Sequence, residues 1–166
     1  MEMPKMILAP VDFSSHSKDA VDEAADLAKR LDSQLLLVNV VSALPKLPSA
    51  SAFFHEAEFE QELHKQAESQ LAAIAQKYAA MGITVRTHVG TANDVAMELL
   101  RIGEHEGVDL IVIATHGMTG WHKLAFGSVT EKVVRLASCP VLVLRADPGA
   151  KASISEAKPA AAAAVR

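Results

Sequence analysis

Five short apolar runs, separated by four stretches with helical spacing, constrain the fold of this chain more than any other feature of its sequence. The runs lie at residues 5–12, 35–41, 84–89, 109–114 and 140–144 and are rich in Val, Ile and Leu. The second and fourth are almost continuously apolar, which is typical of strands covered on both faces. The alternation predicts an α/β fold, a doubly wound five-stranded parallel sheet with right-handed crossovers and helices on both faces.

Four amphipathic helices are expected between these runs. The first spans residues 15–31, and a longer second helix runs from about Phe53 to Met81. The segment Thr91-Ala-Asn-Asp94 predicts a capped start for the third helix. Ser128 and Glu131 have the spacing of a capping box, which predicts that the Ser128 side chain caps the fourth helix.

The length of 166 residues is typical of one domain. We expect this domain to cover residues 1–146. Residues 147–166 are rich in alanine and include only two large apolar residues, Ile154 and Val165, so this segment can bury little and is expected to be a disordered tail.

Composition and charge exclude several classes of partner. Half of the residues are hydrophobic, which is enough for a packed core. The formal net charge of −4 argues against binding to nucleic acid or to an anionic membrane surface. The single cysteine excludes an internal disulfide, and no apolar run approaches the ~20 residues of a membrane helix. With no signal peptide at the start, a cytoplasmic location is expected.

In open sheets of this kind, ligands bind outside the carboxyl ends of the strands, where the strand order reverses. The first strand ends with Pro10, Val11 and Asp12, and the fourth ends at Ala114. If these two strands are neighbours, the loops that follow them face one cleft.

A glycine-punctuated loop after the fourth strand suggests an anion site. It contains Gly117, Gly120 and Gly127, and a helix starts at Ser128. Glycines allow close approach of a ligand, and a helix N-terminus offers unpaired N–H groups with partial positive charge. The alternative is a simple connector in which Ser128 only caps the helix. The two commonest phosphate fingerprints, GxxxxGK[ST] and GxGxxG after a strand, are absent.

The loop resembles a motif of the universal stress protein family. Nucleotide-binding members show G-x2-G-x9-G-[ST], and here Ala114 takes the first position, followed at matching spacing by Gly117, Gly127 and Ser128. The opening ILAPVDFS, the second strand with Val38-Asn39-Val40, and the close SCPVLVLR add to the resemblance. It spans residues 3 to about 146.

The resemblance implies a sheet of order 3-2-1-4-5, similar to that of adenine-nucleotide α-hydrolases, and a role in stress response. It also implies a homodimer in which the last strand pairs with its counterpart. That strand comprises Val141, Leu142, Val143 and Leu144. An apolar edge strand is a liability when uncovered, so this pairing is physically reasonable.

The ligand implied by the resemblance is an adenine nucleotide, ATP or AMP, and Mg²⁺ would accompany ATP. Carried over to this chain, the base and ribose would lie near Pro10, Val11, Asp12, Val40 and Ala114. The phosphates would lie near His116, Gly117, Met118, Gly127, Ser128, Val129 and Thr130.

Two departures from the family pattern matter for this site. Ala114 adds a methyl group, which is tolerable only if the backbone there has negative φ. Met118 stands where many relatives carry Arg or Lys, and loss of that cation removes one charge-assisted contact, worth about 1.5–3 kcal/mol if buried. We therefore hypothesise that AMP and ATP bind with comparable affinity.

An enzyme is the main alternative, a slow ATPase or nucleotide transferase that uses Asp12, Ser128 and His116. Phosphoryl transfer needs metal ligands and a positioned cation, which the sequence does not clearly supply. Asp12 is more simply explained as a ligand contact or a cap of the next turn. His116 and His122 lack a helical register for a metal site, and we expect Cys139 to be buried and inert.

Overall fold

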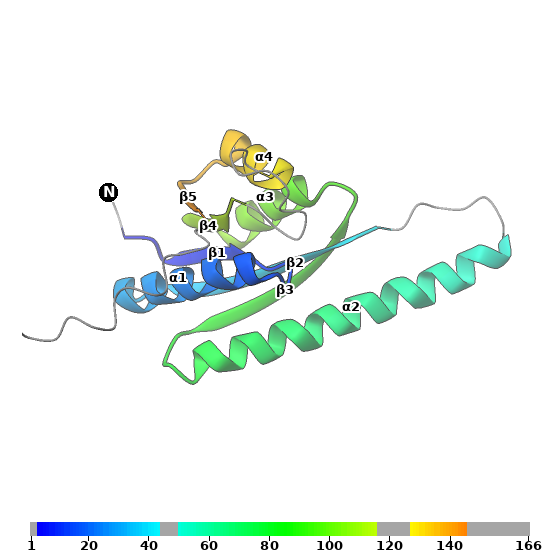
Figure 1. The fold of residues 1–166 in the computed structure, drawn as a ribbon, viewed down its shortest axis with the longest axis horizontal. Helices are drawn as coiled ribbons and strands as arrows, with labels where there is room; N and C mark the ends of the chain where they lie inside the picture. The colour runs from blue at the N-terminus through cyan, green and yellow to red at the C-terminus, as the bar shows by residue number, and fades with distance from the viewer. Residues whose placement is uncertain (1–2, 44–49, 116–126, 146–166) are drawn as a thin grey trace, which may run out of the picture.

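The structure is a computed structural model that describes residues 3–43, 50–115 and 127–145, with only the backbone for residues 50–57. Strands and helices alternate along the chain (Figure 1). The strands are β1 (Met6–Pro10), β2 (Gln34–Ser42), β3 (Val85–Ala92), β4 (Leu110–Ala114) and β5 (Val141–Leu144). The helices are α1 (Ser15–Leu31), α2 (Ala50–Ala79), α3 (Val95–Glu106) and α4 (Ser128–Leu136). Among the helices in these ranges, none is long and apolar enough to cross a membrane.

The five strands form one parallel sheet of order β3-β2-β1-β4-β5. In β1, Ile7 is paired with Leu35 of β2 on one side and with Leu110 of β4 on the other. The chain adds β2 and β3 on one side of β1 and then returns to add β4 and β5 on the other. The strand order therefore reverses between β1 and β4, and the predicted fold class is confirmed.

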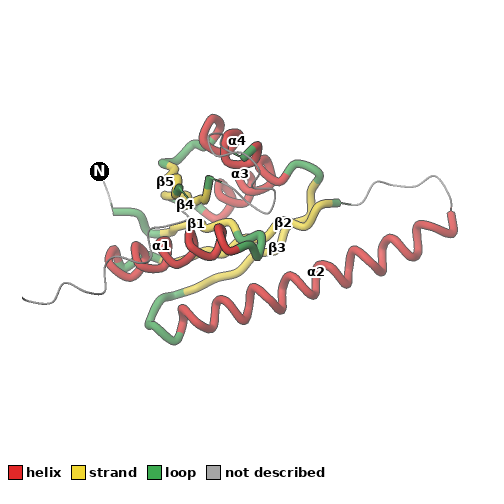
Figure 2. The backbone as a smooth tube through the Cα atoms, in the orientation of Figure 1, coloured by secondary structure: helices red, strands yellow, loops and turns green. Residues whose placement is uncertain are grey.

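Helices cover both faces of the sheet because side chains alternate along each strand (Figure 2). Ile7 and Leu35 point into a core closed by α1 and α2, where Leu71 of α2 is fully buried. Their neighbours Leu8 and Leu36 point into a second core, closed by α3 and α4. The helices pack on the two faces of the sheet, so the carboxyl ends of the strands remain accessible to a ligand.

The helix ends differ from expectation in two places. Helix α2 begins at Ala50 rather than at Phe53, and it ends at Ala79. The predicted capping box is wrong, because Gly127 is the N-cap of α4 and no side chain caps this helix. The Glu131 amide donates to the Gly127 carbonyl at 2.9 Å, so Ser128 is already the first helical residue and its hydroxyl is not positioned to cap.

The expected capped start of the third helix is confirmed, and Asp94 is the capping residue. Its carboxylate accepts a hydrogen bond from the Met97 amide at 3.2 Å and an ion pair from Lys132 of α4. The ammonium group and the Met97 amide both lower the pKa of Asp94. This pair fixes the start of α3 next to α4.

Candidate functional site

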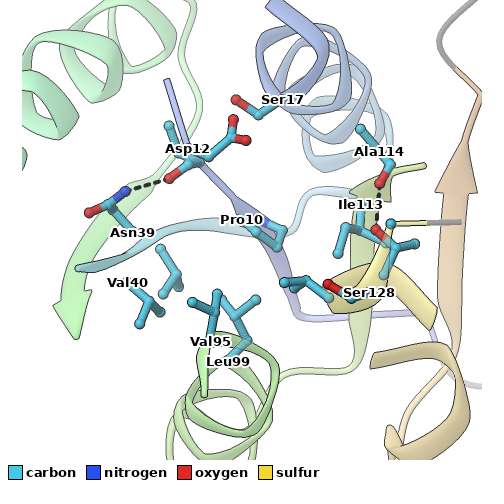
Figure 3. Close-up of a pocket in the computed structure, with 15 residues that line it drawn as sticks. Pro10, Asp12, Ser17, Asn39, Val40, Val95, Leu99, Ile113, Ala114 and Ser128 are labelled. Carbon is cyan, nitrogen blue, oxygen red and sulfur yellow. Dashed lines mark hydrogen bonds between the residues drawn. The ribbon is translucent and has the colours of Figure 1, made fainter. Parts of the chain in front are cut away.

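A cleft of about 220 Å³ opens at the carboxyl ends of β1, β2 and β4, at the point where the strand order reverses (Figure 3). Nine of the residues predicted from the sequence line it: Pro10, Val11, Asp12, Val40, Ala114, Gly127, Ser128, Val129 and Thr130. The other three, His116, Gly117 and Met118, lie outside the described residues. The position is the one where ligands bind in doubly wound folds.

The β1 side of the cleft is held by hydrogen bonds to β2. The Val11 amide donates to the Val38 carbonyl at 2.8 Å, which extends the pairing one residue past the end of β1. The Asn39 side-chain amide donates to the Val11 carbonyl at 2.7 Å. Because Asn39 is only 8% exposed, this bond is shielded from water and fixes the chain just before Asp12.

Asp12 is oriented by the turn that follows it. Its carboxylate accepts hydrogen bonds from the Ser14 amide at 3.0 Å and from the Ser14 hydroxyl at 2.6 Å. The Ser14 hydroxyl in turn accepts from the Ser17 amide and caps α1. Phe13, between them, has a φ of 62°, which is unusual for a bulky residue. Asp12 is thus a preorganised acceptor at the mouth of the cleft (Figure 3).

The opposite wall is the start of α4, which is fastened to the end of β4. The Gly127 amide donates to the Thr115 carbonyl at 2.8 Å. The Thr130 hydroxyl, buried at 4% exposure, donates to the Ala114 carbonyl at 2.8 Å. These two bonds aim the first turn of α4 into the cleft, together with the partial positive charge of its N-terminus.

The backbone of this wall explains which residues are tolerated at positions 114 and 127. Positive φ occurs, among described non-glycine residues, only at Phe13 and Asp32, so Ala114 adopts a conformation that tolerates its methyl group. A Cβ added at Gly127 would lie 3.3 Å from the Thr115 carbonyl oxygen, which is closer than most side chains allow. Glycine is therefore favoured here by close packing, since a larger residue would have to displace the Thr115 carbonyl by a few tenths of an ångström, and not by its φ of −59°.

The floor of the cleft is mainly apolar. Residues that the sequence did not single out for the site complete it: Ser17, Val38, Asn39, Val95, Leu99 and Ile113. Asn39 carried the one usable signal, since it is a polar residue inside an otherwise apolar strand. Val95 and Leu99 lie on α3, whose approach to the cleft depends on tertiary packing.

Charge is sparse in the described lining. Asp12 is the only ionisable side chain among the lining residues that the structure describes. Glu98 of α3 lies outside the lining, and its ion pair with Arg101 lowers its pKa. Within the described ranges, no group of three or more potential ligands is placed to hold a metal. An anionic ligand would therefore meet helix N–H groups on this wall rather than a basic side chain.

Comparison with known proteins agrees with this architecture. Residues 3–145 match the model of the universal stress protein family. The chain belongs to this family. A universal stress protein of Methanocaldococcus jannaschii is 31% identical over 144 residues, covering 85% of this chain and 82% of the relative. The resemblance expected from the sequence is thereby confirmed.

Solved structures extend the comparison. The Methanocaldococcus jannaschii protein MJ0577 superposes with a TM-score of 0.77 at 27% identity, covering 88% of this chain and 99% of that one. Universal stress protein UspA of Lactobacillus plantarum gives 0.75 at 26% identity, covering 85% and 97%. Two structures of the same fold, at 17% and 18% identity, are complexes with dAMP, from Archaeoglobus fulgidus, and with cAMP.

Proposed function

We propose that the cleft binds an adenine nucleotide, ATP or AMP, and that the chain acts in stress response as a nucleotide-linked homodimeric regulator. The observation that carries the proposal is the position of the α4 N-terminus. It opens into a cleft at the switch point of the sheet, and Ser128 is exposed with no capping bond to occupy it. Helix N–H groups in this arrangement bind phosphate without a basic residue.

Each part of a nucleotide has a matching wall. The adenine would pack on the apolar floor, with Val40 and the backbone of Pro10 and Val11 at its edge. The ribose hydroxyls would donate to Asp12, which the Ser14 turn already orients. The first phosphate would meet the amides at the start of α4, and the further phosphates would reach residues of the loop that precedes it.

The family relatives support the choice of ligand. Members of the same fold are solved with dAMP and with cAMP, which share an adenine, a sugar and one phosphate. These are the parts for which the described walls of the cleft are suited. The loss of a cation at Met118 concerns the outer phosphates, so we propose that ATP and AMP bind within about tenfold of each other, a difference of at most ~1.4 kcal/mol.

The binding proposal is tested by thermal unfolding of the full chain with ATP, with AMP and with neither. A nucleotide at 100 times its dissociation constant adds about 2.7 kcal/mol, which raises the melting temperature of a chain this size by roughly 5–10 °C. Gly127→Val should abolish this gain by displacing the start of α4. Gly103→Ala, which also adds bulk at a glycine but meets nothing closer than 3.8 Å, should keep it.

Two results would count against nucleotide binding. One is the absence of a thermal shift with either nucleotide, and the other is a shift that Gly127→Val leaves intact. Binding of ATP more than tenfold tighter than AMP in calorimetry would refute the argument from Met118 alone. Turnover of ATP that Asp12→Asn abolishes would instead support the enzymatic alternative.

The homodimer is proposed through β5. This strand lies at the edge of the sheet and is paired with β4 alone in the isolated chain. Leu142 is 37% exposed there, and the other residues of the strand are half-buried. In sedimentation velocity, Leu142→Lys should shift the chain towards monomer, whereas Met97→Lys, at a comparably exposed apolar residue of α3, should not. Equal behaviour of the two variants would contradict this interface.

A further inference from the structure

A second cavity, separate from the nucleotide cleft, lies between the first turn of α1 and the last turns of α2. Its volume is about 400 Å³. The two cavities share only Val11 and Ser17, so the turn from β1 into α1 separates them. We call this second cavity the α1–α2 groove. Neither nucleotide binding in the cleft nor dimer formation through β5 accounts for it.

The wall of the groove is mainly apolar. Val21 of α1 and Tyr78 of α2 are almost fully buried, and Ile74 packs against the same core. Ala73 lines the groove with only a methyl group, which leaves it open on the α2 side. A cavity of this composition favours an apolar occupant.

The rim of the groove carries an exposed aromatic side chain on a strained backbone. Phe13 has a φ of 62° and is 39% exposed. A bulky L-residue in this region costs about 1–2 kcal/mol, and exposing a phenyl ring to water gains nothing in return. The conformation turns Phe13 onto the rim of the groove, where an apolar ligand would cover it.

The charges that line the groove are positive. Among its described lining residues, Lys18 and Lys77 are the only charged side chains. Lys77 is already neutralised, because it donates to Asp22 at 2.8 Å and that carboxylate also accepts from the Tyr78 hydroxyl at 2.7 Å.

The second lysine of the groove is Lys18. Its side chain is exposed and makes no hydrogen bond or ion pair within the described part of the chain, although its positive charge helps to lower the pKa of Asp22. Lys18 stands in the first turn of α1, which contains no acidic residue. The two lysines thus share one carboxylate, Asp22, which Lys77 binds directly, so the groove has an apolar body with an excess of positive charge and complements a ligand with one negative charge on an apolar tail.

We propose that the α1–α2 groove binds a small amphipathic monocarboxylate, such as a medium-chain fatty acid. The acyl chain lies against Phe13, Ile74 and Ala73, and the carboxylate pairs with Lys18. The site is independent of the nucleotide cleft, so the proposal stands or falls separately from nucleotide binding.

The experiment is calorimetric titration of the full chain with sodium decanoate below its micellar concentration, with decylammonium as the ligand of opposite charge. Decanoate should bind at one site per chain with a dissociation constant on the order of 0.1 mM, and decylammonium should bind at least tenfold more weakly. Lys18→Ala and Ala73→Leu should each weaken decanoate binding at least tenfold, by loss of the cation and by filling of the groove.

Matched variants control for general effects. Lys29→Ala removes an exposed lysine from the other end of α1, and Ala72→Leu enlarges the neighbouring exposed alanine of α2, which does not line the groove. Both should bind decanoate like the unmodified chain, as should Gly127→Val, whose change lies in the other cavity.

Four results would overturn the proposal. These are no saturable binding, equal binding of decylammonium, decanoate binding that Lys18→Ala and Ala73→Leu leave unchanged, and competition between decanoate and ATP. A change in sedimentation caused by Ala73→Leu without any decanoate binding would instead show that a second copy of the chain occupies the groove, and would refute the proposal as stated.

Discussion

Replacing Asn39 by aspartate tests the bond that holds the β1 side of the cleft. In the native chain, the Asn39 amide donates to the Val11 carbonyl at 2.7 Å, and the side chain is 8% exposed. An aspartate of nearly the same shape can donate to that carbonyl only when its carboxyl group is protonated. In its charged form it would place a poorly solvated carboxylate against a carbonyl oxygen.

Both effects raise the pKa of the new carboxyl group in the folded state. Burial and loss of the favourable hydrogen bond together should move it upward by about 2–3 units from the unfolded value of roughly 3.9. Since one unit corresponds to 1.36 kcal/mol, Asn39→Asp should lose about 3–4 kcal/mol of unfolding free energy at neutral pH. A group with a raised folded-state pKa gives its full stability below the unfolded pKa and loses it as pH rises through the folded pKa.

The assay is urea unfolding of Asn39→Asp, Asn39→Ala and the unmodified chain at several pH values between about 4 and 8. The deficit of Asn39→Asp relative to the unmodified chain should be small at the acid end and grow towards neutral pH. Asn39→Ala, which lacks a titrating group, should show a deficit of about 1–3 kcal/mol that is nearly constant with pH. An Asn39→Asp deficit that does not change with pH would refute the reasoning.

Three further outcomes are expected from urea unfolding. Thr130→Val removes the 2.8 Å bond to the Ala114 carbonyl and should cost about 1–2 kcal/mol, while an unchanged midpoint would show that the bond contributes nothing. Burial opposes ionisation of Asp22, but hydrogen bonds from Lys77 and Tyr78 outweigh it and lower its pKa. Stability from this group is therefore lost as pH falls through the lowered pKa, so Asp22→Asn should decline less steeply than the unmodified chain below about pH 4. Asp32 ends α1 with a φ of 55°, and Asp32→Gly should stabilise the fold by about 0.5–1 kcal/mol; a loss would contradict the assigned strain.

Much of the fold was accessible from local sequence patterns. The continuous apolar runs predicted parallel strands, and the helical spacing between them predicted which segments cross over. The capped start of α3 within Thr91-Ala-Asn-Asp94 was predicted because a side chain that accepts from the third amide ahead needs only local geometry. The cap at Ser128 was predicted by the same rule and is wrong. The start of α4 is set by the Gly127 amide bonding to Thr115, a contact from outside the helix.

The residues of the candidate site also fall into those that the sequence indicated and those that it did not. Residues at the strand ends line the cleft as expected because the topology of a doubly wound sheet determines where the cleft opens, and the glycine before α4 was indicated by the motif of the family resemblance. Val95 and Leu99 could not be predicted, because α3 reaches the cleft through its packing on the face of the sheet that it shares with α4. The α1–α2 groove was also beyond sequence reasoning. Its two walls come from helices that are separated along the chain by β2 and the residues that follow it.

The sequence by itself determined the order of strands and helices, the two-sided burial of the sheet and the edge at which a ligand would bind, because these follow from the spacing of apolar residues. Only the tertiary structure decided how each wall of the cleft is held and which charged side chains are paired. Whether Asn39 reaches the Val11 carbonyl, or Lys77 binds Asp22 directly, depends on distances between residues far apart in the chain. No pattern of neighbouring residues encodes those distances.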